Sequence, residues 1–426
     1  MDSERLESKM SNLYWWLRFG PFSPGEGILP HMGEVIAHYR KKRGYRTQAD
    51  FAIAAGVTLR TVQEWETSIM THNHERRIFL AKLLKVPVAL LGLDWRLVVY
   101  QDNLGTQTNP MEHLAHLIEE DTYYHYEDTL LMGWACLRKG DLPHFAERVT
   151  RRLRKLQTLV RQAPESEKEA WQGLLCQYYQ LAEGYARHSG MSKGQKNQAV
   201  AYSTAAIQLA TDLEHVELLG SALFRDTQLH VEHGNYDLAR KSAQGAMGYI
   251  DRVRSPLKGN IYLVAADVNA HYAAHDERLR NQCRQWQDKA ANLVYKGNLE
   301  DDGTFLKLNL AGVHHERAKT LLYFFQHKPQ KEFLRDARTE LTAAWEKLTP
   351  DLMLWRMHFY ETEARIYEAE HDLEGSVRSG KEALKIAMFM QSNSGRETVT
   401  KLYHDLNAID SLNPYVRNLS VELGIF

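Results

Sequence analysis

The residues whose types and spacing best support a chemical role lie in the stretch TQADFAIAAGVTLRTVQEW, from Thr47 to Trp65. Thr47 and Asp50 have the spacing of a helix-capping box, and Gly56 stands where a helix must end in a left-handed residue. A second helix begins after Thr58, which can cap it. The pattern predicts two short helices joined by a tight glycine turn, which can place the second helix in the major groove of duplex DNA.

Amphipathic helices on either side must position this pair. Residues 32–43 are expected to form a helix with an apolar inner face and a basic outer face, made of Arg40, Lys41, Lys42 and Arg43. Residues 75–85 are expected to form another helix, which stops before Pro87. Together these elements suffice for a compact all-α module.

The ordered set of residues in this segment resembles the lambda-repressor-like helix-turn-helix family, the xenobiotic-response-element class of regulators. The resemblance covers residues 31–92 and is carried by Gly33-Glu34, Ile36, Thr47-Gln48-Ala49-Asp50-Phe51-Ala52, Gly56-Val57-Thr58, Val62, Glu66, Leu83-Leu84-Lys85-Val86-Pro87 and Leu90-Leu91. The family usually has an asparagine-glycine turn after the third helix. This chain has Thr67-Ser68-Ile69-Met70 there, so the shape of that loop stays open.

The resemblance implies which residues face DNA: Gln48, Thr58, Leu59, Arg60, Thr61 and Glu64, with Arg43 and Arg46 beside them. Gln48 would lie near a phosphate, and Arg60 would bridge guanine O6 and N7. Leu59 suits a thymine methyl group, and the two threonines suit phosphates or base edges. Glu64 departs from the pattern, because an acid is repelled by phosphate unless it accepts a hydrogen bond from cytosine N4. The alternative is a DNA-binding fold reused for protein contacts.

Charge favours the DNA interpretation. Residues 32–85 contain ten Lys and Arg and five acids, a net charge of +5, whereas the whole chain carries −1. The rest of the chain therefore carries −6. Basic charge concentrated on one small module is expected for a protein that contacts phosphates.

Composition and length limit the remaining possibilities. A chain of 426 residues is too long for one core and predicts several domains or a repeat array. We find no apolar run long enough to span a bilayer and no secretory leader, so we expect a cytoplasmic protein without membrane contact. The three cysteines show no CxxC spacing and are expected to be reduced core thiols.

Enzymatic and metal chemistry have weak signals. The chain has no Walker-type phosphate loop, nucleophile elbow or zinc-protease motif, so we expect no enzyme and no cofactor. His314-His315-Glu316 and the pair His113 and His116 have ligand-like spacing, but no third ligand is indicated. Histidines on solvated helix faces are the simpler interpretation, and we expect no metal site.

Beyond residue 120 the chain is helical in pattern and repetitive. The clearest unit runs from Gly220 to Ile250, where Gly234-Asn235-Tyr236-Asp237 joins two helices and small residues line the second. This pattern is that of tetratricopeptide hairpins. Equivalent positions recur at Ala206, Ala246 and Trp286, forty residues apart, and at Ala344 and Ala383, thirty-nine apart. A longer loop is expected around Lys296 to Gly303. Such hairpins stack into a right-handed solenoid.

The first helix of each hairpin is expected to line a concave groove. The candidate ligand-binding residues are Phe224, Gln228, Val264, Val268, His271 and Arg365. Long polar side chains in such a groove can bind a peptide backbone, and apolar ones can hold its side chains. The alternative for each residue is an ordinary solvated or interhelical position.

The sequence thus predicts an all-α protein with an N-terminal helix-turn-helix domain followed by a tetratricopeptide-like α-solenoid. The expected divisions are an aromatic arm at 1–30, the DNA-binding domain at 31–92, a linker at 93–120 and the repeats at 121–426. The order resembles Gram-positive peptide-pheromone receptor regulators, and this implies a homodimer that binds duplex DNA and responds to a peptide or small effector. The alternative is a DNA-anchored scaffold that recruits a protein partner through the solenoid.

Overall fold

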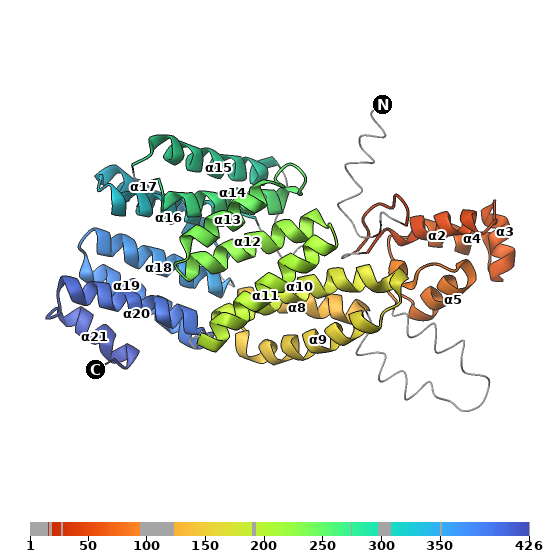
Figure 1. Ribbon diagram of the computed structural model, residues 1–426, viewed down its shortest axis with the longest axis horizontal. Helices are drawn as coiled ribbons and strands as arrows, with labels where there is room; N and C mark the ends of the chain where they lie inside the picture. The colour runs from red at the N-terminus through yellow and green to blue at the C-terminus, as the bar shows by residue number, and fades with distance from the viewer. Residues whose placement is uncertain are drawn as a thin grey trace. The chain divides into compact units, whose positions relative to one another are not determined.

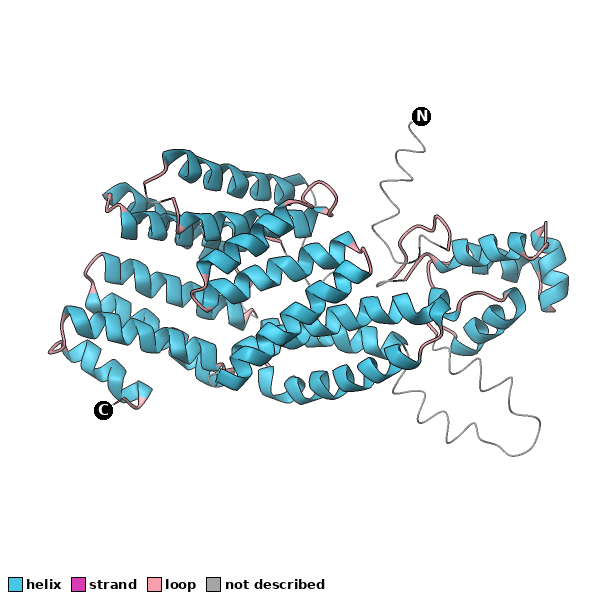
Figure 2. Ribbon diagram, in the orientation of Figure 1, coloured by secondary structure: helices cyan, strands magenta, loops and turns pink. Residues whose placement is uncertain are grey.

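The structure of this protein is a computed structural model that describes residues 16, 19–26, 29–93, 123–189, 193–273, 275–296, 308–349 and 352–425. Within these ranges the regular elements are helices, and extended pairing is limited to an isolated bridge between Pro24 and Pro30 (Figures 1 and 2). The predicted all-α class is confirmed. No helix of the described ranges combines the length and apolar character needed to cross a membrane.

By its internal contacts the chain divides into two compact units. The first unit comprises residues 1–131, 151–178 and 211–215, and the second comprises residues 132–150, 179–210 and 216–426. The boundaries fall inside four helices, which therefore contribute to both units: α8 (Tyr123–Lys139), α9 (Leu142–Gln162), α10 (Glu165–Ser189) and α11 (Lys193–Asp212).

The first unit opens with a helix-turn-helix module, which we call the head. It consists of α2 (Met32–Lys42), α3 (Gln48–Ala55), α4 (Leu59–Thr67), α5 (His74–Leu84) and the 3-10 helix η2 (Val88–Leu91). Helix α2 packs on α4, α5 and η2, and α3 packs on α4. The buried side chains at these contacts include Val35, Ile36, Phe51, Val62, Trp65, Leu80, Leu84 and Leu90.

The turn between α3 and α4 has the predicted geometry. Thr47 Oγ1 accepts a hydrogen bond from the Asp50 amide at 3.1 Å, and the Asp50 carboxylate accepts one from the Thr47 amide at 3.1 Å. Gly56 ends α3 in the left-handed region, with φ 65° and ψ 32°. Thr58 Oγ1 then accepts from the Thr61 amide at 3.2 Å, which caps α4. The short glycine turn therefore fixes where α4 begins.

Arg40 differs from its predicted outward position, and that prediction is wrong for this residue. Its side chain is buried, and its Nε lies 2.5 Å from Glu66 Oε1. Its guanidinium also donates to the Tyr45 carbonyl at 2.8 Å. A buried charge is tolerated only when it is paired and hydrogen-bonded, and Arg40 meets both conditions. It joins α2 to the end of α4 instead of facing solvent.

The loop after α4 is held by the start of α2. The Met32 amide donates to the Ile69 carbonyl, and the Gly33 amide donates to the Ser68 carbonyl, each at 3.0 Å. A Cβ atom at Gly33 would lie 2.3 Å from the Glu66 carbonyl oxygen. Glycine is therefore required at this position for the backbones of α2 and the end of α4 to approach.

A carboxylate of α10 completes the first unit. Glu167 is buried, and its two oxygens accept hydrogen bonds from the amides of Val88 at 3.0 Å and Ala89 at 2.9 Å. These amides open η2 and have no partner within that short helix. Glu167 thereby ties the end of the head to α10.

Part of the predicted N-terminal arm packs against the head. Trp16 and Phe22 are buried, and the Trp16 indole donates to the Phe22 carbonyl at 3.0 Å. The Phe22 ring meets His38 of α2 edge-on, with 5.3 Å between ring centres. Three further apolar residues of the arm, Tyr14, Trp15 and Leu17, lie outside the described residues. So does the predicted linker at 93–120, apart from Leu93.

The second unit is an α-solenoid of stacked hairpins. The first helices of the hairpins are α12 (Val216–Glu232), α14 (Ser255–Ala270), α16 (Leu310–His327), α18 (Met353–Ala369) and α20 (Asn393–Ile409). Their partners are α13 (Tyr236–Met247), α15 (Glu277–Lys296), α17 (Lys331–Lys347), α19 (Leu373–Phe389) and α21 (Pro414–Leu423). Each first helix also packs on the next first helix, so α12, α14, α16, α18 and α20 form one inner layer.

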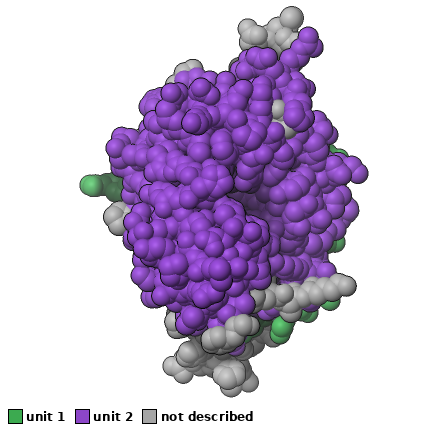
Figure 3. All heavy atoms as spheres, turned by 90° about the vertical axis from the view of Figure 1, so that its left-hand side faces the viewer, with its two compact units in different colours: residues 1–131, 151–178, 211–215 green, residues 132–150, 179–210, 216–426 purple. Residues whose placement is uncertain are grey.

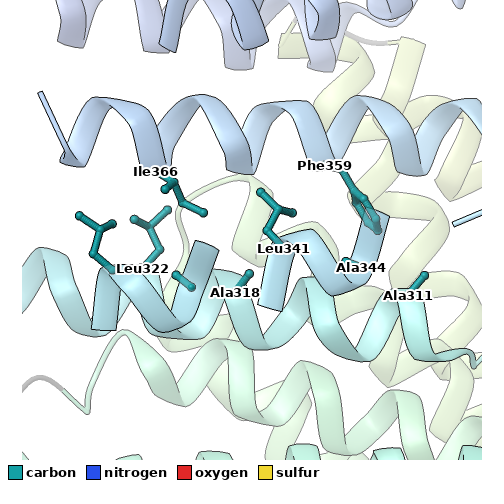
Figure 4. Packing of buried hydrophobic residues seen from close by; sticks show 9 residues of the cluster. Ala311, Ala318, Leu322, Leu341, Ala344, Phe359 and Ile366 are labelled. Carbon is teal, nitrogen blue, oxygen red and sulfur yellow. The ribbon is translucent and has the colours of Figure 1, made fainter. Parts of the chain in front are cut away.

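Small residues make the close contacts inside the hairpins, as the repeat pattern predicts. Ala239, Ala243 and Ala246 of α13 are buried. In the hairpin of α16 and α17, Ala318 and Ala344 lie beside Leu322 and Leu341, and α18 adds Phe359 and Ile366 to the same cluster (Figure 4). Most of the loop predicted around Lys296 to Gly303 lies outside the described residues.

The close approach at Gly33 yields a stability test. Gly33→Ala should destabilise the head by about 2–3 kcal/mol, because the added methyl group meets backbone and cannot be relieved by a side-chain rotation. The measurement is hydrogen exchange of peptides from α2 and α4. Gly245→Ala in α13 is the matched control, since its Cβ would meet only Leu223 side-chain atoms. Equal protection of α2 and α4 in Gly33→Ala and the unaltered chain would contradict the assignment.

Candidate functional site

The outward face of α4 carries an exposed arginine and an acid one turn away. The side chain of Arg60 is 87% exposed and that of Glu64 is 63% exposed, with Arg60 Nε 3.1 Å from Glu64 Oε1. Thr58 and Thr61 are joined through their hydroxyl oxygens at 2.8 Å, and Leu59 is exposed. An exposed pair at this spacing contributes little to stability, so Arg60 can exchange its partner at small cost.

Two other predicted DNA-facing side chains have partners within the head. The Gln48 amide group donates to Glu66 Oε2 at 2.8 Å. Arg43 Nε donates to the Leu84 carbonyl at 2.8 Å, where it satisfies the end of α5. Arg46 is exposed. The structure thus places Leu59, Arg60, Thr61 and Glu64 on α4, with Thr58 as its N-cap. Gln48 and Arg43 form hydrogen bonds that a DNA contact would have to replace or share.

A cavity of about 450 Å³ opens on the inner layer of the second unit. Residues from α8, α10, α11, α12, α14, α16, α18 and α20 line it. Figure 3 shows the same unit in space-filling form, with its surface hollowed on the face in view. A volume of this size suits a small molecule or a few residues of peptide. Its wall combines charged side chains with aromatic and aliphatic ones. The aromatic and aliphatic residues include Trp134, Phe224, Val264, Trp355 and Phe359.

One part of the wall carries a surplus of negative charge. Lys319 Nζ lies 3.3 Å from Asp267 Oδ2 and 3.0 Å from Glu316 Oε2. Burial by itself lowers the pKa of Lys319, but Asp267 and Glu316 outweigh it and hold that pKa well above its usual value. Burial raises the pKa of Glu316. Two carboxylates thus share one ammonium group between α14 and α16.

Another part of the wall has the opposite balance. Lys196 Nζ lies 3.0 Å from Glu397 Oε2, and Lys401 Nζ lies 3.6 Å from Glu397 Oε1. Two ammonium groups therefore share one carboxylate between α11 and α20. These interactions, with Lys196 in particular, hold the pKa of Glu397 below its usual value despite partial burial. The cavity presents opposite charge surpluses on different helices.

Among the histidines that line the cavity, His188, His315 and His358 have pKa values shifted in different directions; His188 and His315 are buried, and His358 is half-buried. Burial lowers the pKa of His188 and of His315 well below 6.5. Burial also opposes protonation of His358, but Glu361 outweighs it, and the pKa of His358 is raised. His358 Nδ1 lies 2.9 Å from Glu361 Oε2, and His315 Nε2 lies 2.8 Å from Thr362 Oγ1.

The structure divides the predicted groove residues into two sets. Phe224, Gln228 and Val264 line the cavity together, whereas the other three lie outside its lining. Val268 is buried in the core, and His271 stacks on Tyr236 with 3.9 Å between ring centres. Arg365 forms ion pairs with Glu368 at 2.7 Å and Asp405 at 2.6 Å.

Sequence reasoning missed Asp267, His315, Glu316 and Lys319 as members of one wall. The signal lay in the helical phase, because α14 lines the cavity with residues at spacings of three and four: Asn260, Leu263, Val264 and Asp267. Asn260 and Asp267 are polar residues seven apart in an apolar helix, so they mark the inner face. The predicted inner face of α14 contained Val264 and Val268, whereas the cavity is lined by Val264 and Asp267.

The histidine pattern noted in the sequence does not converge on one point. His314 Nδ1 lies 2.6 Å from Glu340 Oε2, whereas His315 bonds Thr362. No group of three or more potential His, Cys, Asp or Glu ligands occurs among the described residues. His113 and His116 lie outside them.

No family model matches the chain, and no curated protein matches it. A comparison with solved structures finds similarity to the apo form of the competence regulator ComR from Streptococcus vestibularis. The two chains are 14% identical, the match covers 93% of this chain and 99% of that chain, and the TM-score is 0.21. A TM-score this low does not establish a common fold.

The histidines predict a pH dependence. His188 and His315 have folded pKa values below 6.5, so their contribution to stability is present above pH 6.5 and is lost as the pH falls toward the folded values. His358 has a raised pKa, so its contribution is present below pH 6.5 and is lost as the pH rises through its folded pKa. Acidification from about pH 7 to about pH 5 should therefore destabilise the unit through His188 and His315, by at most about 1.4 kcal/mol per histidine per pH unit.

Urea unfolding of His315→Gln over this pH range tests the assignment. The variant should show a shallower loss of unfolding free energy on acidification than the unaltered chain. His404→Gln, the same change at an exposed position of α20, is the control. An unchanged pH slope in His315→Gln would show that His315 is not held neutral by burial.

Proposed function

We propose that this protein is a sequence-specific DNA-binding transcriptional regulator whose solenoid senses a peptide or small effector and mediates dimerisation. The observation that carries the proposal is one chain with a basic helix-turn-helix head and a separate cavity of mixed charge and apolar character. The head carries exposed donors on α4 that suit DNA, and the cavity has the size and lining of a ligand site.

In this proposal α4 is the recognition helix. Arg60 leaves Glu64 and donates to guanine O6 and N7, while Glu64 accepts from a neighbouring cytosine N4 or stays solvated. The Thr58 hydroxyl and the N-terminal turn of α4 face phosphates. Gln48 and Arg43 contribute mainly to the shape of the head, because their donors are already bonded to Glu66 and to α5. Two heads, one from each copy of a homodimer, read two half-sites.

The solenoid supplies the regulatory part of the proposal. Apolar groups such as Phe224 and Val264 can hold ligand side chains, and Gln228 can bond a peptide backbone. A ligand changes DNA affinity only if it binds one arrangement of the protein better than another. The proposal therefore requires that cavity occupancy and operator affinity be coupled.

The second candidate function is a DNA-anchored scaffold that recruits a protein partner. It is favoured by exposed apolar side chains near the C-terminal end of the solenoid, including Phe389 and Leu412, both 72% exposed. Native mass spectrometry of the purified chain separates the two functions. A bound mass of a few hundred daltons supports the sensor, and a co-purified folded protein supports the scaffold.

Arg60→Ala tests the DNA-binding proposal. The variant should lose about 1–3 kcal/mol on duplexes that the unaltered chain selects from a random pool, and it should lose its preference at one base pair. Arg335→Ala is the matched control, because Arg335 is also exposed and paired with an acid, Asp336, but lies on α17. If Arg60→Ala keeps the full base preference, α4 is not the recognition helix as placed here.

Gln228→Ala tests the sensing proposal, with Arg365→Ala as its comparison. Loss of the Gln228 amide should weaken binding of the co-purified effector about fivefold to tenfold, the effect of one neutral hydrogen bond. DNA binding without effector should be unchanged, since Gln228 lies in the second unit and α4 in the first. Weakened binding in both variants would extend the site beyond the cavity to Arg365. Loss of effector-free DNA binding in Gln228→Ala would contradict the separation of roles.

A further inference from the structure

One carboxylate oxygen in the cavity wall has no hydrogen-bond donor among the described residues. Asp267 on α14 is only 4% exposed, and it lines the cavity. Its Oδ2 lies 3.3 Å from Lys319 Nζ, but its Oδ1 is buried and unbonded. Buried polar groups in folded proteins are nearly always satisfied, so an exception inside a cavity points to a donor that arrives with a ligand.

The charges around Asp267 indicate what kind of donor is missing. Lys319 is shared with Glu316, so with both carboxylates ionised the three groups carry a net charge of −1. The neighbouring ring, His271, cannot supply the positive charge, because burial lowers its pKa to about 4. A neutral amide donor would bond Oδ1 without balancing the charge. A cationic donor forms a charge-assisted hydrogen bond with Oδ1 and also balances the charge.

A second carboxylate in the cavity wall, that of Glu361, also has an oxygen without a hydrogen-bond donor among the described residues. Glu361 Oε2 is paired with His358 Nδ1 at 2.9 Å, while its Oε1 is buried without a bond. Glu361 is thus balanced by a histidine whose pKa is raised. Asp267 instead shares Lys319 with Glu316. The opposite surplus, of Lys196 and Lys401 over Glu397, lies on α11 and α20, so a ligand cation is directed toward α14 and away from those helices.

We propose that Asp267 Oδ1 binds an alkylammonium group of the ligand, supplied by the amino terminus of a short peptide or by a lysine side chain. The assignment rests on the proposed function, in that it names the chemistry by which the sensing cavity recognises its effector. Lys319 holds the Asp267 carboxylate through Oδ2, and Oδ1 keeps its capacity to accept a hydrogen bond. The ammonium group donates to Oδ1, and the rest of the peptide occupies the apolar part of the cavity.

Three tetrapeptide mixtures test the assignment by equilibrium dialysis against the full chain, with retained peptides measured by mass spectrometry. The first mixture has free amino termini and no lysine. The second is the same mixture acetylated at the amino terminus. The third is acetylated and carries one lysine. The proteins are the unaltered chain, Asp267→Asn, Glu361→Gln and the control Asp288→Asn, in which Asp288 pairs with Arg317 outside the cavity.

We expect the unaltered chain and Asp288→Asn to retain the first or the third mixture roughly tenfold or more above the second. The mixture that is retained identifies the source of the ammonium group. In Asp267→Asn the ratio should fall close to one, while the thermal midpoint stays near that of the unaltered chain because Lys319 keeps Glu316. Glu361→Gln should keep most of the preference.

Three results would overturn the assignment. Equal retention of all three mixtures by the unaltered chain would show that no ammonium group is recognised, while peptide sensing would stand; this comparison needs no variant to fold. Loss of the preference in Glu361→Gln but not in Asp267→Asn would move the cation to Glu361. Retention of no mixture would reject peptide sensing itself, and the assignment with it.

Discussion

A helical hairpin has an apolar face that it cannot bury alone, and the architecture of the second unit depends on this constraint. Small residues such as Ala243 and Ala344 let the two helices of a hairpin approach closely, and the remaining apolar surface is covered only by the next hairpin. Stacking then lines up α12, α14, α16, α18 and α20 as neighbours. These helices line the cavity together with α8, α10 and α11. The stacking that buries the apolar faces of the hairpins therefore also builds the wall of the cavity.

The inner layer is partly buried, so its charged side chains are expected to be paired and hydrogen-bonded, which charges on an exposed surface need not be. Lys319 is held between Asp267 and Glu316, and Arg187 lies 3.1 Å from Glu183 and 2.6 Å from Glu232. Replacing such clusters with apolar residues would usually cost a fold little. Asp267, Glu316, Lys319, Arg187 and Glu232 line the cavity, and Asp267 Oδ1 has no donor among the described residues. Under the proposed function, these charges serve ligand recognition more than stability.

Elements that are fixed by hydrogen bonds between near neighbours could be predicted from the sequence. The position of a side chain could not be predicted where it depends on a residue far away in the chain. Thr47, Gly56 and Thr58 define α3 and α4 through bonds to near neighbours, so their roles could be read from spacing. Arg40 looks like one more residue of a basic face, and only Glu66, twenty-six positions away, makes it a buried residue. In α14 a helical phase error of one residue exchanged Asp267 for Val268. Periodicity cannot fix that phase in a helix that is apolar on most sides.

The same distinction bears on the charge of the head. The net charge of +5 over residues 32–85 includes every cation, whether or not its side chain can contact DNA. Arg40 is paired with Glu66, Arg43 donates to the end of α5, and Arg77 is buried with its guanidinium on the Thr71 and Leu91 carbonyls. All three still add to the positive potential of the head, which in the proposed function attracts DNA. They do not each reach a phosphate, however, so the ten basic residues are an upper bound on the counterions released. Under the proposed function, the salt dependence of DNA binding should therefore follow the smaller exposed set that includes Lys41, Lys42, Arg46 and Arg60.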